Sequence, residues 1–296
     1  MVMRSAFIDE LVLAAEQNTH VVLVVGDLGF GVVEPFAKRF PDRFFNAGVA
    51  EQNMMGLCAG LASEGHHVFA YSIANFPTFR CAEQIRNDVD YHNLPVTIVA
   101  VGGGVAYGSL GYSHHAIQDY ALMRVLPNML IASPGDLWET RACVRFLVEN
   151  PRPSYLRLGK AGEPEVHDKS PSVAPGEWLE VVSPTRADRR AALLTTGATL
   201  ALGQRWLKSG EYTDYGLFSL PLWGMRHKAA QAKMVEHFNE IVTVEDHIFD
   251  AGFGSWLQEA LRTVDSDCGV SSRALSADIF GVVGAQQTLN SIGGLK

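Results

Sequence analysis

Side chains that could do chemistry gather at three places in this chain of 296 residues. Glu51 is the one acid near the start of an apolar, helix-like stretch, and His114 and His115 are neighbours in a loop rich in glycine and tyrosine. A first-turn acid can simply complement the helix dipole, and adjacent histidines can belong to a solvated loop or cap a helix. Acids and a histidine at 245–247 suggest a metal site, but a third ligand is missing, so we predict no metal site in this chain.

The stretch around Glu51 reads FFNAGVAEQNMMGLCAGLASE from residue 44 to residue 64. It predicts a short apolar strand, a break at Ala47-Gly48, and then a helix rich in small residues. Glycine inside a helix costs about 1 kcal/mol relative to alanine, so Gly56 and Gly60 require a compensating contact. Their spacing of four puts them on one helix face, where another backbone could approach closely.

The string GVAEQNMMGLCAGLASEG resembles the pyrimidine-binding domain of thiamine-diphosphate enzymes of the transketolase family. In that family, a glutamate in this setting binds N1′ of the aminopyrimidine of the cofactor and shares a proton with it. The resemblance therefore implies that Glu51 is catalytic and binds thiamine diphosphate. A buried carboxyl with a raised pKa would suit this role, because desolvation disfavours the charged form.

The same resemblance implies further cofactor contacts. Phe76 and Phe79 lie in IANFPTFRCAEQIR, where the family packs aromatic side chains on the pyrimidine ring. Ile73 replaces an earlier aromatic residue, so we expect a reduced stacking surface; without the resemblance, Phe76 would be read as core. Asp27 matches an acid near the cofactor at the end of the first strand, although it could equally cap the following turn.

Residues 111–114 read GYSH and resemble the family loop that ends in Thr-His or Ser-His beside the reactive carbon. This implies that His114 is catalytic and binds substrate, and that His115 binds substrate in place of the usual glutamine. A histidine there can donate hydrogen bonds or relay protons near neutral pH. Arg4 and Lys160 match basic residues that contact substrate phosphate, although each alone would be an ordinary surface charge.

Two departures from the family pattern concern the substrate. Leu110 stands where transketolases have an aspartate that reads a substrate hydroxyl, and Gly102 stands where they have a histidine. Sites built to hydrogen-bond a hydroxyl discriminate strongly through that bond. We therefore expect a substrate that differs from the ordinary pentose phosphates near the reacting carbons, such as a deoxy, branched or otherwise modified sugar.

Alternation of apolar strands with helical patterns predicts an α/β protein with two domains, each a mostly parallel sheet flanked by helices. The run VVLVV is typical of a strand buried on both faces. We expect a pyrimidine-binding domain at 1–160, a linker rich in Pro, Gly and Ser at 161–185, and a transketolase C-terminal-like domain at 186–296. Helices are expected at 78–89 and 226–238, among others.

The diphosphate- and metal-binding domain of a full transketolase has no counterpart, because Leu28 interrupts the GDG motif that would mark it. The resemblance thus implies the C-terminal, β-type subunit of a split enzyme that transfers a ketol or acyl unit between sugar-like substrates. A separate N-terminal, diphosphate-binding subunit would hold Mg²⁺, most simply in an α2β2 heterotetramer. Two alternatives stay open: a subunit of a decarboxylating relative (2-oxoacid dehydrogenase or deoxyxylulose-phosphate synthase), and a non-catalytic assembly subunit.

Composition excludes several other classes. A net charge of −8 gives no electrostatic footprint for nucleic acid or an anionic membrane. No apolar run reaches the length of about 18 residues that crosses a bilayer. Four dispersed cysteines without a CxxC pair indicate reduced thiols, and we expect a cytoplasmic protein.

Overall fold

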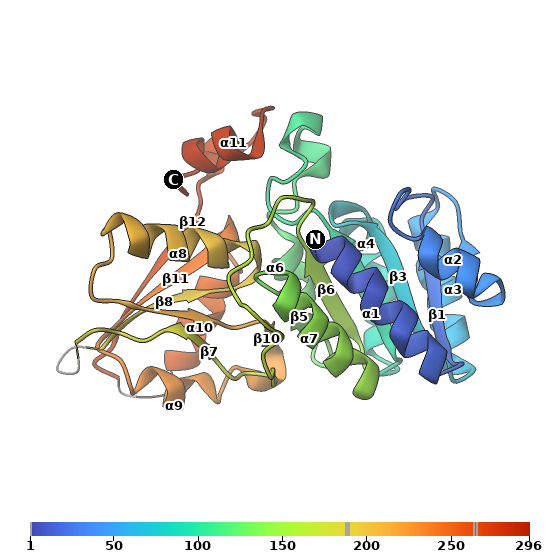
Figure 1. The fold of residues 1–296 in the computed structure, drawn as a ribbon, viewed down its shortest axis with the longest axis horizontal. Helices are drawn as coiled ribbons and strands as arrows, with labels where there is room; N and C mark the ends of the chain where they lie inside the picture. Colours follow the sequence, from blue (N-terminus) through green and yellow to red (C-terminus); the bar gives the residue numbers. More distant parts are fainter. Residues whose placement is uncertain (1, 187–189, 263, 265) are drawn as a thin grey trace.

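The computed structural model describes residues 2–186, 190–262, 264 and 266–296, which form two sheets lying side by side (Figure 1). The helices and strands of the first half are, in chain order, α1 (Met3–Gln17), β1 (Val21–Val25), α2 (Glu34–Arg39), β2 (Phe44–Asn46), α3 (Glu51–Ser63), β3 (His67–Ile73), α4 (Asn75–Phe79), α5 (Ala82–Gln84), β4 (Val96–Val101), α6 (Asp119–Met123), β5 (Leu130–Ala132), α7 (Leu137–Glu149) and β6 (Ser154–Leu158). Those of the second half are β7 (Leu179–Val182), β8 (Ala191–Thr195), α8 (Leu200–Ser209), β9 (Gly216–Ser219), β10 (Leu222–Trp223), α9 (Gln231–Val235), β11 (Glu240–Ile248), α10 (Phe253–Leu261), β12 (Gly269–Leu275) and α11 (Gln286–Ile292).

Both sheets are mostly parallel, which confirms the predicted α/β class. The first has the order β10-β5-β6-β4-β3-β1-β2 and the second β12-β11-β8-β9-β7. The exceptions are β10, antiparallel to β5, and β7, antiparallel to β9. The expected linker at 161–185 therefore ends in a sheet strand, and β10 of the second half completes the first sheet. The domain boundaries themselves stay a prediction.

Strand β1, the run VVLVV that the sequence predicts to be buried on both faces, is covered on both faces. In β1, Val22 and Val24 share a core cluster with Met54 of α3, whereas Leu23 shares the opposite cluster with Phe7 of α1. Alternate residues of a strand point to opposite faces, so helices on both sides require apolar residues at every position. The two helix layers are visible in Figure 1, where α1 and α7 lie in front of the first sheet.

Two helix predictions need correction, and one helix was missed. The expected helix at 78–89 is instead α4, α5 and a π-helical turn at Ile85–Asp90. It starts earlier because Pro77 is tolerated in a first turn, and it breaks at Cys81, whose φ is −126°. The helix expected at 226–238 shrinks to α9 and a 3₁₀ turn at Met225–His227, and α11 was not predicted at all.

The parallel strands β1, β2, β3, β4 and β6 place their carboxyl ends along one edge of the first sheet. The segments that follow these ends carry the predicted site residues, namely Asp27, Glu51, Phe76, His114 and Lys160. Ligands of open α/β sheets bind at this edge. The topology alone therefore brings together side chains that are far apart in the sequence.

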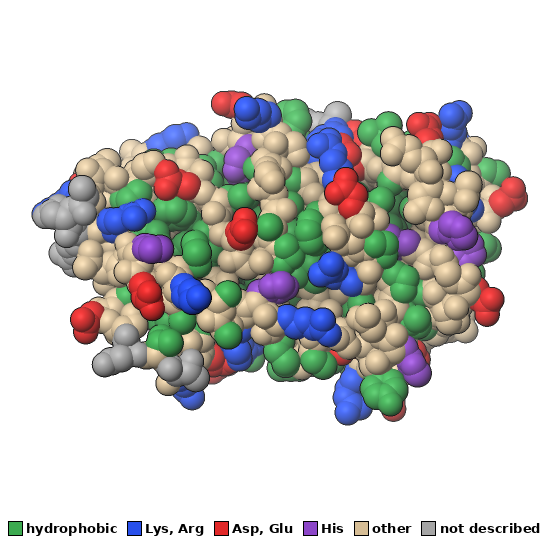
Figure 2. All heavy atoms as spheres, turned by 90° about the horizontal axis from the view of Figure 1, so that it is seen from below, with side chains coloured by type: hydrophobic (Ala, Val, Ile, Leu, Met, Phe, Trp, Pro, Cys, Tyr) green, Lys and Arg blue, Asp and Glu red, His purple; other side chains and the backbone are tan. Residues whose placement is uncertain are grey.

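The surface carries charges of both signs. On the face shown in Figure 2, Lys and Arg side chains are interspersed with Asp and Glu, and neither sign forms a continuous field there. Among the residues that the structure describes, no helix has the length and apolarity needed to cross a bilayer.

Candidate active site

Glu51 is the first residue of α3, and its side chain is only 5 % exposed. The carboxylate is not alone in this buried position. Arg80, at the carboxyl end of α4, donates a hydrogen bond from Nη1 to Oε1 of Glu51 at 2.8 Å, and its own side chain is 49 % exposed. The structure therefore places a half-exposed cation directly on the predicted catalytic acid.

Phe76 of α4 forms the second wall of the same cluster. Cζ of Arg80 lies 4.1 Å from the centroid of the Phe76 ring, and the His114 ring meets Phe76 edge-on at a centroid distance of 5.1 Å. The structure thus brings together Glu51, Phe76 and His114, as predicted, around an arginine that sequence reasoning missed. The available signal was Arg80 itself, a charge within the short segment already identified as lining the pyrimidine.

His114 ends a 3₁₀ turn at Tyr112–His114 and is held by its own loop. Ser113 Oγ lies 3.0 Å from Nδ1 of His114, and the Asn75 side-chain amide donates to the Ser113 carbonyl at 2.8 Å, which ties the loop to α4. Burial, and then the nearby Arg80 cation, lower the pKa of His114 below its usual value. Near neutral pH the imidazole is therefore mainly uncharged and can both donate and accept a hydrogen bond.

Tyr107, another residue that sequence reasoning missed, links the predicted phosphate contacts to this cluster. Its ring lies 6.4 Å from that of His114, and Nζ of Lys160 lies 4.6 Å from its centroid. Burial raises the pKa of Tyr107, and the Arg4 cation opposes this rise, which places Arg4 beside the same ring. A Cβ at Gly102 would overlap the Tyr107 ring, so a phenol fills the space beside the position where the family has a histidine.

Asp27 has its own partner at the sheet edge. Its backbone N–H donates to Oδ1 of Asn46 at 3.1 Å, and Nδ2 of Asn46 donates to Oδ1 of Asp27 at 2.9 Å. Asn46 Oδ1 also accepts from the Gly48 N–H at 2.9 Å. Asp27 therefore braces the turn that leads into Glu51, and whether it also contacts the cofactor stays a prediction.

Phe79, His115 and Leu110 lie outside the Glu51 cluster. The exposed Phe79 and the buried His115 line a second cavity of about 340 Å³ beside the His114 loop, together with Asn75, Tyr112, Ser113 and Gln118. Leu110 is 55 % exposed on a 3₁₀ turn of the same loop. Their predicted contacts with cofactor or substrate stay predictions.

The carboxyl-terminal segment supports this loop from behind. The Gly284 N–H donates to the Gly108 carbonyl at 3.2 Å, and a Cβ at Gly108 would overlap Leu289 of α11. Figure 1 shows α11 next to the green segment around residue 110, at the top of the view.

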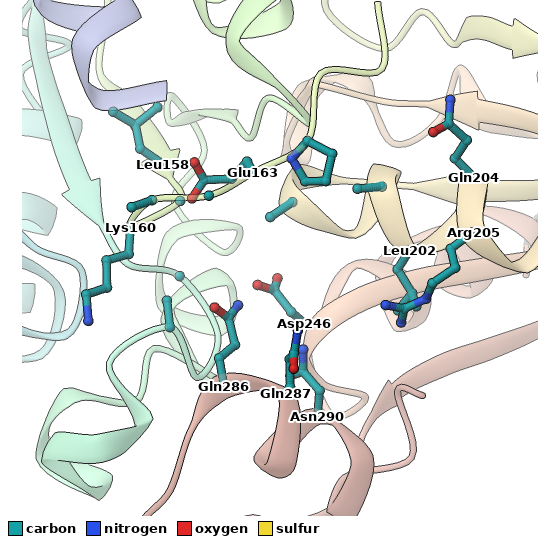
Figure 3. Close-up of a pocket in the computed structure, with 18 of the residues that line it drawn as sticks. Leu158, Lys160, Glu163, Leu202, Gln204, Arg205, Asp246, Gln286, Gln287 and Asn290 are labelled. Carbon is teal, nitrogen blue, oxygen red and sulfur yellow. The ribbon is translucent and has the colours of Figure 1, made fainter. Parts of the chain in front are cut away.

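A separate cavity of about 440 Å³ lies between the two halves and α11. In Figure 3, Lys160 extends away from Asp246, while Gln286, Gln287 and Asn290 approach from α11. Glu51, Phe76 and His114 do not line this cavity. The cluster around Glu51 is therefore distinct from it and opens elsewhere on the sheet edge.

The residues around Glu51 fit one end of the cofactor that the sequence implies. An aminopyrimidine needs an acceptor for a ring N–H and a flat apolar face, and Glu51 and Phe76 supply both. That a planar guanidinium already makes both contacts shows that the space and polarity suit such a group. Within the described ranges, no group of three or more His, Cys, Asp or Glu side chains is placed to hold a metal ion.

Comparison with known proteins supports the same class. Residues 1–163 match the family model described as transketolase, pyrimidine binding domain. The chain therefore belongs to the transketolase family, whose enzymes are transferases that depend on thiamine diphosphate.

Individual proteins are similar to this chain over most of its length. The chain is 34 % identical to one subunit of the apulose-4-phosphate transketolase of Phocaeicola vulgatus, covering 87 % of this chain and 83 % of the relative. It is 32 % identical to a putative transketolase C-terminal section of Methanocaldococcus jannaschii, covering 99 % and 92 %. A solved structure described as a split gene transketolase, inactive beta4 tetramer, matches with a TM-score of 0.85 and 31 % identity, covering 100 % of this chain and 94 % of that one.

Proposed function

We propose that this chain is the β-type subunit of a split transketolase that transfers a ketol or acyl unit between sugar-like substrates. The observation that carries the proposal is the buried carboxylate of Glu51, joined through Arg80 to the ring of Phe76, with His114 in edge contact with that ring. A subunit with only an assembly role would not need a nearly buried acid at this sheet edge, because burying a carboxylate is costly.

Each residue of the cluster has a distinct task in this function. When bound, thiamine diphosphate supplies a nucleophilic carbon that attacks the substrate carbonyl. Glu51 would hold a proton at N1′ of its pyrimidine, and Phe76 would hold the ring flat. His114, mainly uncharged near neutral pH, would donate a hydrogen bond to a substrate oxygen.

The diphosphate end of the cofactor, with its Mg²⁺, belongs in this proposal to an N-terminal subunit of the same enzyme, in an α2β2 heterotetramer. Two features support a missing partner. The relatives that this chain covers over most of their length are named as one subunit of an enzyme and as a C-terminal section. Moreover, added Cβ atoms at Gly56 and Gly60 would meet nothing, so the close contact expected there is not made by the described residues and a partner remains to supply it.

The substrate side favours a modified sugar with an anionic group. Arg4 and Lys160 flank Tyr107 and provide positive charge for a phosphate. Gly102 leaves room for Tyr107, and Leu110 offers no hydroxyl-reading group. Comparing xylulose 5-phosphate and ribose 5-phosphate with deoxy and branched sugar phosphates tests this. Efficient turnover of the two ordinary substrates would contradict it.

The test of the function itself uses Glu51→Gln in the complex purified with its native partner. Glutamine still accepts a hydrogen bond but cannot exchange the proton, so we expect hydrogen–deuterium exchange at thiazolium C2 to slow by several orders of magnitude. Glu64→Gln, an exposed glutamate just beyond the same helix, is the matched control and should leave exchange unchanged. An exchange rate insensitive to Glu51→Gln would return this residue to a helix-dipole role.

The same complex separates the remaining alternatives. Release of carbon dioxide from pyruvate would identify a decarboxylating relative instead of a ketol transferase. Calorimetry on the isolated chain tests the need for a partner, since we expect weak binding of thiamine diphosphate and Mg²⁺ and no turnover. Tight, metal-dependent binding without a partner would contradict the split arrangement.

A further inference from the structure

The Arg80 guanidinium makes two contacts at once, and they come from different elements. Nη1 donates to the carboxylate of Glu51 on α3, and Cζ lies 4.1 Å above the ring of Phe76 on its own helix. A guanidinium is flat, delocalised and a donor at its edge, and it stacks on aromatic faces. An aminopyrimidine that shares a proton with a carboxylate has the same three properties, so the two groups require the same space.

We propose that Arg80 is a displaceable occupant of the pyrimidine site: it closes the site in the cofactor-free chain and moves out when the aminopyrimidine binds. This inference rests on the proposed function, because it needs an aminopyrimidine as the incoming group. It assigns a role to a residue that is neither the acid nor the stacking platform. Arg80 acts through Glu51 and Phe76 and is therefore a positioning residue.

The cost of an empty site explains why an occupant is useful. Glu51 is nearly buried, and leaving a buried carboxylate without a partner is much more costly than leaving an exposed one unpaired. Arg80 supplies the compensating charge until another N–H donor arrives. Because the exchange replaces one donor by another at the same oxygen, Glu51 stays paired throughout.

The position of Arg80 allows this exchange without unfolding a helix. Its side chain is half exposed, so the guanidinium has a direct path to water. The residue follows the last turn of α4, just before the break at Cys81 that separates α4 from α5. The Arg80 side of the ion pair is half exposed and its cation–π contact is weak, so an incoming ring that itself pairs with Glu51 can displace both.

Displacement of Arg80 also affects the pKa of His114. Arg80 is the second of the two causes, after burial, that lower the pKa of this imidazole, and the His114 ring is in edge contact with Phe76. When the guanidinium leaves, His114 loses the repulsion of a fixed cation. Cofactor binding and the protonation of the substrate-side histidine are therefore coupled through one side chain.

The binding test measures the dissociation constant of thiamine diphosphate by calorimetry in the complex with the native partner. Arg80→Ala removes the competitor, so we expect about 5- to 30-fold tighter binding, with Arg80→Lys in between because an ammonium cannot stack as a flat group. Arg86→Ala, an exposed arginine of the adjoining helical turn, is the control and should leave binding unchanged. Unchanged or weaker binding by Arg80→Ala would overturn the proposal while leaving the proposed function intact.

A second measurement needs neither partner nor cofactor. Denaturant unfolding of the isolated chain with Arg80→Ala, Glu51→Gln and the double variant gives the coupling between the two side chains. A favourable coupling, equivalent to about a 2- to 10-fold change in the folding equilibrium, supports the closed pair; additive effects overturn it. If the pair is coupled but no variant of the complex binds thiamine diphosphate, the proposed function fails and the displacement role fails with it.

Discussion

Two arginine–carboxylate clusters in this chain differ in how deeply the arginine is buried and in how many partners it has. Arg80 is half exposed, contacts one carboxylate, and rests on one ring. Arg157 of β6 is 2 % exposed, and each of its nitrogens donates. Its partners are the carboxylates of Asp119 and Asp246, the Tyr120 hydroxyl, and the carbonyls of Ala116 and Asp246.

The difference separates a structural cluster from the one that we propose is functional. Asp246 lies on β11 and Asp119 on α6, so the Arg157 cluster joins the two halves of the chain in a position that water does not reach. Breaking it would leave buried charges without partners. The Arg80 cluster joins neighbouring helices, and its arginine is half exposed, as our proposal of displacement by a ligand requires. The burial of Arg157, and the fact that each of its nitrogens donates, therefore identify its cluster as structural.

The largest effect on stability that we predict comes from Arg157→Met. The change keeps much of the side-chain volume but leaves Asp119 and Asp246 buried and unpaired, so we expect a loss of about 3 to 5 kcal/mol in the free energy of unfolding. Urea denaturation measures it. Arg39→Ala, which removes an exposed ion pair with Glu16, should cost less than about 1 kcal/mol. Equal losses of unfolding free energy in the two variants would contradict the difference between a buried cluster and an exposed ion pair.

A pH-dependent effect of intermediate size is expected at Glu245, which neighbours Asp246. Glu245 caps α10 by accepting from the N–H groups of Phe253 and Gly254, and burial raises its pKa to about 8. Its pKa in the folded chain thus lies above the unfolded value, so the folded state binds more protons. Stability is then fully present below about pH 4.5 and is lost as the pH rises through about 8.

Glu245→Gln should remove most of this slope, with a difference on the order of 3 kcal/mol between the two chains in their loss of stability from pH 5 to pH 9. Urea denaturation at a series of pH values measures it. Some slope should remain in the variant, because burial also raises the pKa of Glu139 to about 7. Parallel pH profiles for the two chains would show that Glu245 does not titrate in this range.

A smaller effect on stability than for Arg157 or Glu245 is expected for Arg80→Ala. A half-exposed ion pair and one stacking contact together should contribute less than about 2 kcal/mol to unfolding. The pKa of His114 should rise, because the variant removes a cation that lowers it. Imidazole titration followed by NMR in the isolated chain measures this shift, with Arg86→Ala as control. An unchanged pKa would place the guanidinium too far from His114 to act on it.

Sequence reasoning reached the α/β class and the family, and it selected Glu51, Phe76 and His114, which the structure places in one cluster. It could do so because buried parallel strands are continuous apolar runs whose ends must share one edge. Arg80 and Tyr107 were missed because their roles depend on which side chains face them across the fold. Periodicity along the chain carries no such information.

The triple glycine at 102–104 shows the same limit. Gly102 and Gly104 have positive φ values, which glycine adopts without strain. The structure adds that each glycine makes room for a different group: a Cβ would overlap Tyr107 at 102, the Arg157 guanidinium at 103, and Asp246 at 104. Those three neighbours come from three separate segments, which no local pattern identifies.

Strand β10 belongs to the second half of the chain but pairs with β5 of the first sheet, and this has a consequence for biosynthesis. After β6 ends at Leu158, the ribosome adds a further 65 residues (223 − 158) before Trp223 completes β10. At about 5 to 20 residues per second this takes roughly 3 to 13 s. Until then the outer edge of β5 has no partner strand, and an open edge can pair with another nascent chain. A fragment that stops after β6 would keep that edge of β5 without its partner strand, so the first sheet depends on the second half of the chain to close it.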